Sequence, residues 1–260
     1  MQDDDDDKVR KLLAAAHGTG TLSAQSLATL DVIDVGAQIQ AGLGVSIDDV
    51  AASEVVLLTM MPDDSASIAS AGNTPSVIDG HNFVLEALGA SRQSGEVLAH
   101  TRYLNGHVLF PYVTLDHAVK MSSANYDPRL GTPLFDQSAV LLGTVIAKAQ
   151  ELAQAGIAVR TVTLIITDGG DYGSTRCKAA DIKALVEDML AQENHIVAAM
   201  GIHDGSTDFR AVFRSMGIPD RWILTPGNSA TEIRRAFQVF SQSAVRAAQG
   251  GGVQLGGFAN

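Results

Sequence analysis

The stretch Val55-Val56-Leu57-Leu58-Thr59-Met60-Met61-Pro62-Asp63-Asp64-Ser65-Ala66-Ser67 decides the fold of this chain. Its first half is a continuous apolar run bounded by a polar loop, which is typical of a buried parallel strand rather than a half-exposed one. Its second half places Asp63, Ser65 and Ser67 in a D-x-S-x-S pattern at the carboxyl end of that strand. Ligands of open α/β sheets bind at this edge. We therefore expect a cluster of small, hard oxygen donors there.

Two later stretches supply further oxygen atoms. Thr132 lies in Gly131-Thr132-Pro133-Leu134, and Asp168 ends the apolar run Thr161-Val162-Thr163-Leu164-Ile165-Ile166-Thr167. We interpret the three stretches as one divalent-metal site. Taken alone, Asp63-Asp64-Ser65 is equally typical of a segment that caps the next helix. The arrival of Thr132 and Asp168 from two other segments favours the metal site.

These motifs resemble the von Willebrand factor type A (vWA) family, which includes integrin I domains and many bacterial adaptor proteins. The resemblance extends from about Val55 to about Gln249. It implies that the five positions of the family's metal-ion-dependent adhesion site (MIDAS) are filled by Asp63, Ser65, Ser67, Thr132 and Asp168.

The resemblance also implies a cofactor and a kind of partner. The cofactor would be Mg²⁺ (or Mn²⁺), which prefers oxygen ligands and keeps water where the protein leaves gaps. The three hydroxyl residues would be neutral ligands, and Asp63 and Asp168 would act largely through bound water. A metal held in this way keeps an open position, which a Glu or Asp side chain of a protein partner can fill.

The rest of the chain alternates between predicted strands and helices. Strands are expected near 55–61, 97–104, 107–112, 159–167, 196–202 and 221–225. Asn105-Gly106 readily forms a tight hairpin turn, so the second and third strands should be antiparallel. The pattern predicts a three-layer α/β/α, doubly wound, mostly parallel six-stranded sheet with one antiparallel edge strand, a vWA or Rossmann-like fold.

Composition shifts divide the chain into four parts. Residues 1–8 contain the run Asp3 to Asp7 and are predicted to be a disordered acidic tail; Asp3 to Lys8 also resembles an enteropeptidase cleavage tag. Residues 9–53 are expected to form an N-terminal helical extension that packs on the main domain, since alone they are too short for a core. Residues 54–249 form the predicted vWA domain, and 250–260 a flexible Gly-rich tail.

Charge and composition exclude several classes of function. The net charge of −11 argues against nucleic acid as a partner. No segment approaches the roughly 18 consecutive apolar residues of a membrane span. The N-terminus has carboxylates where a secretory signal has basic residues, and the single cysteine, Cys177, fits a reducing compartment. We expect a cytoplasmic protein; its oligomeric state is left open.

The predicted function is a metal-dependent protein–protein interaction module rather than an enzyme. One alternative is a structural scaffold subunit whose metal site is unused. Another is a Mg²⁺-dependent phosphoesterase of the haloacid dehalogenase type, which needs a second aspartate where this chain has Ser65. Hydrolase, P-loop and dinucleotide motifs are absent from the sequence. Asp64 and Asp171 lie near the site in sequence, and we expect both to face solvent.

Overall fold

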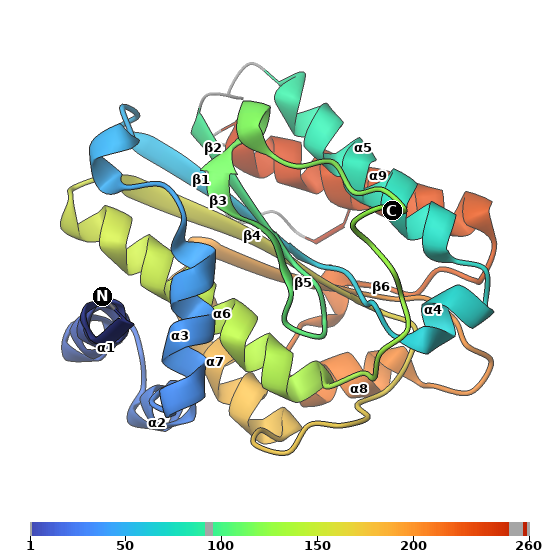
Figure 1. Cartoon of the computed structure of the whole chain (residues 1–260), viewed down its shortest axis with the longest axis horizontal. Coiled ribbons are helices and arrows are strands. Elements are labelled where there is room, and N and C mark those ends of the chain that lie inside the picture. Colours follow the sequence, from blue (N-terminus) through green and yellow to red (C-terminus); the bar gives the residue numbers. More distant parts are fainter. Residues whose placement is uncertain (1, 92–95, 250–256, 259–260) are drawn as a thin grey trace.

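The chain forms a six-stranded sheet between two layers of helices, as the computed structural model shows for residues 2–91, 96–249 and 257–258 (Figure 1). The strands are β1 (Glu54–Met61), β2 (Val97–Arg102), β3 (Val108–Thr114), β4 (Ala158–Thr167), β5 (His195–Gly201) and β6 (Ile223–Leu224). Their order is β3-β2-β1-β4-β5-β6, and every neighbouring pair is parallel except β2 and β3. The predicted fold class is confirmed.

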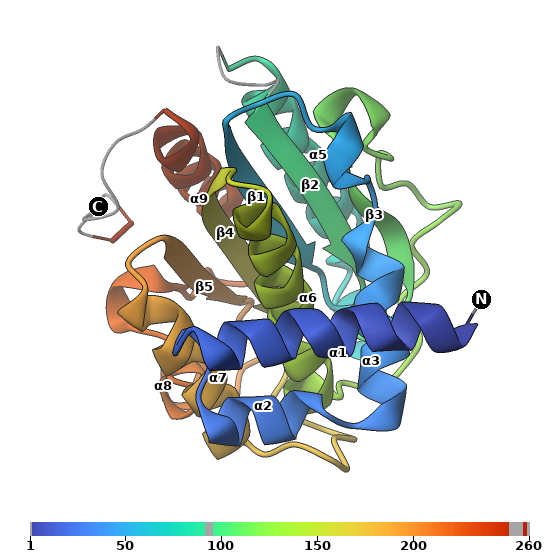
Figure 2. The same cartoon turned by 90° about the vertical axis from the view of Figure 1, so that its left-hand side faces the viewer.

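Helices cover both faces of this sheet. They are α1 (Gln2–Gly18), α2 (Ala24–Leu30), α3 (Ile33–Leu43), α4 (Ala66–Ser70), α5 (Thr74–Gly89), α6 (Leu134–Gln154), α7 (Ala179–Ala191), α8 (Phe209–Ser215) and α9 (Ala230–Ala248). Helices α5 and α9 pack together on one face, and α3, α6 and α7 lie on the other (Figure 1). Figure 2 shows α1 crossing the outer side of α6 and α3.

Helix α6 is the central helix of its layer. It is buried over most of its circumference because α1 and α3 cover the side that would otherwise face solvent. Gly143 makes this close packing possible: a Cβ atom at this position would lie only 2.7 Å from Cδ1 of Ile39 and 2.8 Å from Cδ2 of Leu30. The N-terminal helices therefore belong to the same hydrophobic core as the sheet.

The predicted hairpin is present. Strands β2 and β3 pair antiparallel, and the turn places Gly106 at a φ of 92°, which favours glycine. The last predicted strand, 221–225, is shorter than expected. Asp220–Trp222 forms a 3₁₀ turn after Pro219, so only Ile223–Leu224 pairs with β5.

The N-terminal segment is helical. Helix α1 begins at Gln2, so the disorder expected for residues 1–8 is not what the structure shows. Acidic residues are favourable at a helix N-terminus, and Asp7 forms an ion pair with Lys11 one turn further on. At the other end, the expected flexible tail, 250–260, lies outside the described residues except for 257–258. None of the helices in the described ranges is long and apolar enough to cross a membrane.

Candidate metal centre

The candidate site lies where the strand order reverses. Strands β1 and β4 are neighbours in the middle of the sheet, and the chain continues from β1 to one side and from β4 to the other. Asp63 follows the end of β1 and Asp168 follows the end of β4. Such a reversal point forms the ligand-binding crevice of doubly wound sheets.

A continuous chain of hydrogen bonds joins four of the five predicted residues. The backbone N–H of Ser65 donates to Oδ1 of Asp63 at 2.7 Å. The hydroxyl of Ser67 lies 2.8 Å from that of Ser65 and donates to Oδ1 of Asp168 at 2.5 Å. Residues that are 101 positions apart in the sequence therefore make direct side-chain contact.

Capping of the next helix does not account for this arrangement. Ser65 stands at the N-cap position of α4, yet its side chain makes no capping hydrogen bond. Its hydroxyl is directed to Ser67 instead. A pure capping role for Asp63-Asp64-Ser65 is thus disfavoured.

Thr132 reaches the same edge on a separate segment. Its backbone pairs with Tyr172 through N–H···O bonds of 3.1 and 2.8 Å, and Leu130 pairs with Ser65. Its Oγ1 lies 3.9 Å from the position of a Cβ on Gly169, the neighbour of Asp168. Within the described part of the chain, the hydroxyl of Thr132 makes no hydrogen bond to the other four site residues. The structure thus places Thr132 beside the cluster but does not bond it to the cluster.

Burial makes the two carboxylates unusual. Asp63 is completely buried, which raises its pKa to about 6, although hydrogen bonds from Thr167 and Ser65 oppose the shift and Asp168 adds to it. Burial also raises the pKa of Asp168, as does the negative charge of Asp204. Two neighbouring carboxyl groups that resist ionisation are groups whose charged form a cation would stabilise.

The donor set fits a hard divalent cation. The possible ligand atoms of two carboxylates and three hydroxyls are all oxygens. Mg²⁺ and Mn²⁺ prefer oxygen ligands, whereas zinc also accepts nitrogen and sulfur. A group of three or more His, Cys, Asp or Glu side chains that could hold a metal does not occur within the described ranges. The candidate site depends on its hydroxyls as much as on its carboxylates. Ser67 is exposed at the edge, so the cluster is open to solvent on that side.

Comparison with other proteins supports the fold. No protein-family model matches the sequence, and no curated protein shows significant similarity to it. Proximal thread matrix protein 1 from the mussel byssus matches with a TM-score of 0.51 and 15% identity, over 74% of this chain and 48% of that one. The pilus adhesin SpaC from Lactobacillus rhamnosus GG matches with a TM-score of 0.52 and 12% identity, over 74% of this chain and 31% of that one.

The fold is a doubly wound α/β fold of the vWA or Rossmann-like class. At these identities the likeness concerns the fold alone, and this chain corresponds to less than half of either protein. The VWA domain of SpRpn10 also matches, over 70% of this chain and 93% of that one, but at 10% identity and a TM-score of 0.45, from which we conclude nothing further.

Several residues that organise the site were not predicted from the sequence. Thr167 donates to Oδ2 of Asp63 at 2.7 Å, and the buried hydroxyl of Tyr126 donates to the backbone oxygen of Asp63. The expectation that Asp64 faces solvent is wrong. Its Oδ1 accepts hydrogen bonds from the backbone N–H and the side-chain amide of Asn105, at 2.9 and 2.8 Å, and the side chain is buried.

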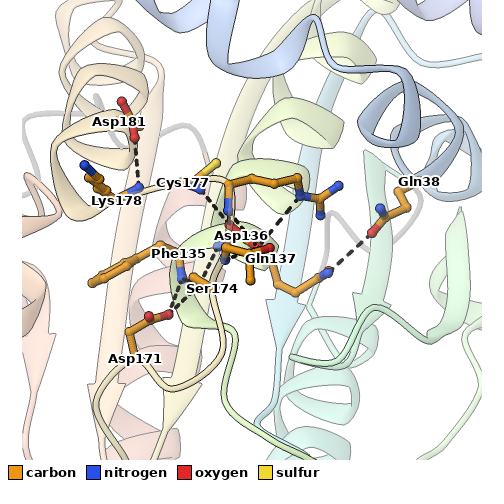
Figure 3. A network of polar contacts seen from close by, with 11 residues as sticks. Gln38, Phe135, Asp136, Gln137, Asp171, Ser174, Cys177, Lys178 and Asp181 are labelled. Atoms are coloured by element: carbon orange, nitrogen blue, oxygen red, sulfur yellow. Dashed lines mark hydrogen bonds and ion pairs between the residues drawn. The ribbon is translucent and has the colours of Figure 1, made fainter.

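Asp171 does not simply face solvent either. Its Oδ1 accepts hydrogen bonds from the Ser174 hydroxyl at 2.5 Å and from the backbone N–H of Phe135 at 3.1 Å (Figure 3). Because Phe135 lies in the first turn of α6, Asp171 ties the loop after β4 to the helix that follows Thr132. Short polar loops give no sequence signal for such partners.

Proposed function

We propose that this chain is a metal-dependent protein-interaction module. It would hold Mg²⁺ (or Mn²⁺) through Asp63, Ser65, Ser67, Thr132 and Asp168, and bind a Glu or Asp side chain of a partner protein. The observation that carries the proposal is the hydrogen-bonded chain from Asp63 through Ser65 and Ser67 to Asp168 at the reversal point of the sheet.

The protein groups have distinct roles in this proposal. One carboxylate oxygen of Asp63 accepts a hydrogen bond from the backbone N–H of Ser65, and the other accepts one from the Thr167 hydroxyl. The protein itself therefore fixes the position of Asp63. The hydroxyls of Ser65 and Ser67 are neutral donors of lone pairs and leave a cation's charge largely uncompensated. Bound there, the cation would supply positive charge and an open coordination position for a carboxylate.

Binding is favoured over catalysis. By their names, the two structural neighbours with the higher TM-scores are a matrix protein and an adhesin. Ser65 also stands where a phosphoesterase of the haloacid dehalogenase type has its second aspartate. The single cysteine supports a cytoplasmic adaptor rather than a secreted protein.

Metal titration tests the proposal directly. Mn²⁺ is titrated into the wild type and into Thr132→Ala by calorimetry, followed by competition with Mg²⁺. We expect one saturable site in the wild type and at least tenfold weaker binding in the variant, because Thr132 would supply a direct ligand. Thr29→Ala serves as control, since the Thr29 hydroxyl donates to the Gln25 carbonyl one turn earlier on α2. Failure of the wild type to bind either ion specifically would contradict the proposal.

A further inference from the structure

Two exposed apolar side chains flank the candidate metal centre. Among the described residues, the large hydrophobic side chains that are exposed are Val32, Phe83, Val119, Leu130 and Tyr172. The two most exposed of them are Tyr172 at 80% and Leu130 at 52%. Both belong to the backbone segments that pair with site residues. Single exposed hydrophobic residues are ordinary, but two beside one polar site are less so.

Backbone pairing fixes both residues relative to the site. Leu130 forms a parallel bridge with Ser65, in which the Ala66 N–H donates to the Leu130 carbonyl at 3.0 Å. Tyr172 forms an antiparallel bridge with Thr132. Residues that stand opposite each other in such pairs direct their side chains to the same side. The backbone pairing therefore directs the Leu130 side chain to the same side as Ser65 and the Tyr172 side chain to the same side as Thr132.

The loop that carries Tyr172 is anchored on its far side as well. Asp136, in the first turn of α6, accepts backbone hydrogen bonds from Thr175 at 2.9 Å and from Cys177 at 2.7 Å (Figure 3). At the other end of the same loop, Asp171 accepts a hydrogen bond from the backbone N–H of Phe135 at the start of α6. Tyr172 is thus exposed on a loop whose backbone is anchored, so little backbone entropy is lost when a partner covers it, and a tyrosine side chain has only two χ angles to order.

Part of the negative charge near the site is compensated, and an acidic ligand depends on the bound metal for its attraction. Asp127 forms an ion pair with Arg129, whereas Asp204 accepts hydrogen bonds from the backbone and hydroxyl groups of Ser206 and Thr207, which lower its pKa and keep it ionised. Asp171 is engaged with the start of α6. A second copy of this chain is a poorer occupant, because each copy carries a net charge of −11.

We propose that Leu130 and Tyr172 are specificity-determining residues of the partner-binding surface. The occupant is an extended peptide segment of a partner protein that has a bulky apolar side chain within two residues of its Asp or Glu. The carboxylate goes to the metal centre, and the apolar side chain packs on Leu130 and Tyr172. This inference rests on the proposed function. Tyrosine is enriched among interface residues that dominate binding.

The test is a peptide selection on the immobilised full chain. A phage-displayed library of random peptides is incubated in Mg²⁺, and bound phage are eluted with a chelator. We expect eluted peptides to contain Asp or Glu with Leu, Ile, Phe, Met, Trp or Tyr within two positions. The dissociation constant of the best peptide is then measured on the wild type, Leu130→Ser, Tyr172→Ser and Val119→Ser.

Val119→Ser is the matched control, because Val119 is 42% exposed and is not part of the paired segments beside the site. We expect Tyr172→Ser and Leu130→Ser each to weaken the peptide about tenfold, a typical effect of losing an interface anchor. Val119→Ser should leave it unchanged, and Mn²⁺ affinity should be the same in all four proteins. Substitutions at exposed positions usually change stability little, and thermal melting verifies that all four proteins are folded.

Two different failures are distinguishable. Selected peptides with an acidic residue but no apolar neighbour, or unchanged affinity in Tyr172→Ser and Leu130→Ser, overturn this inference while the proposed function stands. The inference is also overturned if Mn²⁺ binds but no chelator-eluted peptide is found. Absence of specific Mn²⁺ binding to the wild type overturns the proposed function and this inference together.

Discussion

At the scale of single residues, the position of Asp63 depends on Thr167. The Thr167 hydroxyl donates to Oδ2 of Asp63 and also contacts the backbone of Gly169. We predict that Thr167→Val, which keeps the shape and removes the hydroxyl, weakens Mn²⁺ binding by about 10- to 100-fold, as is usual for groups that orient metal ligands. Calorimetric titration measures the effect.

The same strand provides the control for this prediction. Thr163 is completely buried on β4, and its hydroxyl has no hydrogen-bond partner among the described residues. Thr163→Val should leave Mn²⁺ affinity unchanged and should not lower the free energy of unfolding. Equal affinities in Thr167→Val and Thr163→Val would show that the hydrogen bond to Asp63 does not position the ligand.

The sequence identified side chains that lie together but not those that hold them. Asp63, Ser65, Ser67 and Asp168 were predictable because each follows a recognisable apolar strand, and the ends of parallel strands meet at one edge. The burial of Asp64 was not predictable. It depends on Asn105, which lies 41 positions further along the chain and which the folded hairpin brings against Asp64.

At the scale of elements, Asp136 of α6 makes the largest group of backbone hydrogen bonds between α6 and the loop after β4, in addition to the contact from Asp171. Oδ1 and Oδ2 of Asp136 accept the backbone N–H groups of Thr175, Arg176 and Cys177. Burial alone would raise the pKa of Asp136, but these donors and the Arg176 guanidinium outweigh it, and the pKa is lowered. The carboxylate is therefore ionised at neutral pH and each of these hydrogen bonds is charge-assisted.

We predict that Asp136→Asn lowers the free energy of unfolding by about 2 kcal/mol, because it weakens several hydrogen bonds to a charged acceptor. Chemical denaturation measures this loss. Amide hydrogen exchange of Thr175 and Cys177 should accelerate specifically. Asp181→Asn is the comparison, since Asp181 accepts one backbone N–H from Lys178 and its loss should cost about 1 kcal/mol. Unchanged exchange at Thr175 and Cys177 in Asp136→Asn would contradict the anchoring role.

Elements were predictable where local chemistry determined them. The hairpin followed from Asn105-Gly106, and β1 and β4 followed from unbroken apolar runs. The first part of α1, before Val9, was not predicted as helix because a run of carboxylates has the composition of disordered chains. Two ion pairs favour the helix, Asp7 with Lys11 and Lys8 with Glu151 of α6. The second joins residues that are far apart in the sequence, so no local pattern predicts it.

At the scale of the whole molecule, buried histidines make the fold sensitive to acid. Burial lowers the pKa of His81 and His195 to about 4, and burial together with Arg102 lowers that of His100 to about 3. The unfolded chain therefore binds more protons than the folded one between these values and about pH 6.5. The free energy of unfolding falls as the pH falls through this window.

We predict a loss of about 2 kcal/mol per buried histidine between pH 7 and pH 5. Urea denaturation with a chelator present measures it. The raised pKa of Asp63 acts in the opposite direction, so the histidine contribution is taken from the difference between variants. His81→Gln should flatten the pH dependence, and His203→Gln, at an exposed loop position, should not. Equal slopes in both variants would show that His81 is protonated without unfolding.

The N-terminal helices decide whether residues 54–249 are an independent domain. Their buried apolar residues are Val9, Leu12, Leu13, Ala16, Leu22, Leu30, Val35, Ile39 and Leu43. Burying one large aliphatic side chain contributes about 1.5–3 kcal/mol, whereas a whole domain is stable by only about 5–15 kcal/mol. Removal of this segment would also expose the side of α6 that the helices cover. The fully buried Lys148 would lose its hydrogen bond to the Val45 carbonyl, which is 2.6 Å long, and Glu151 would lose its ion pair with Lys8.

A chain that begins at Glu54 should therefore lose its cooperative unfolding transition and its near-ultraviolet circular dichroism. The full chain should unfold in one step, with far- and near-ultraviolet signals changing together. Both proteins are compared in a urea titration with a chelator present, so that metal binding does not contribute. If the shortened chain unfolded cooperatively at the same urea concentration, residues 9–53 would be an appendage on a self-sufficient domain. The expected result would instead make these helices one layer of the fold, because α6 and the N-terminal helices contribute buried apolar side chains to the same hydrophobic core.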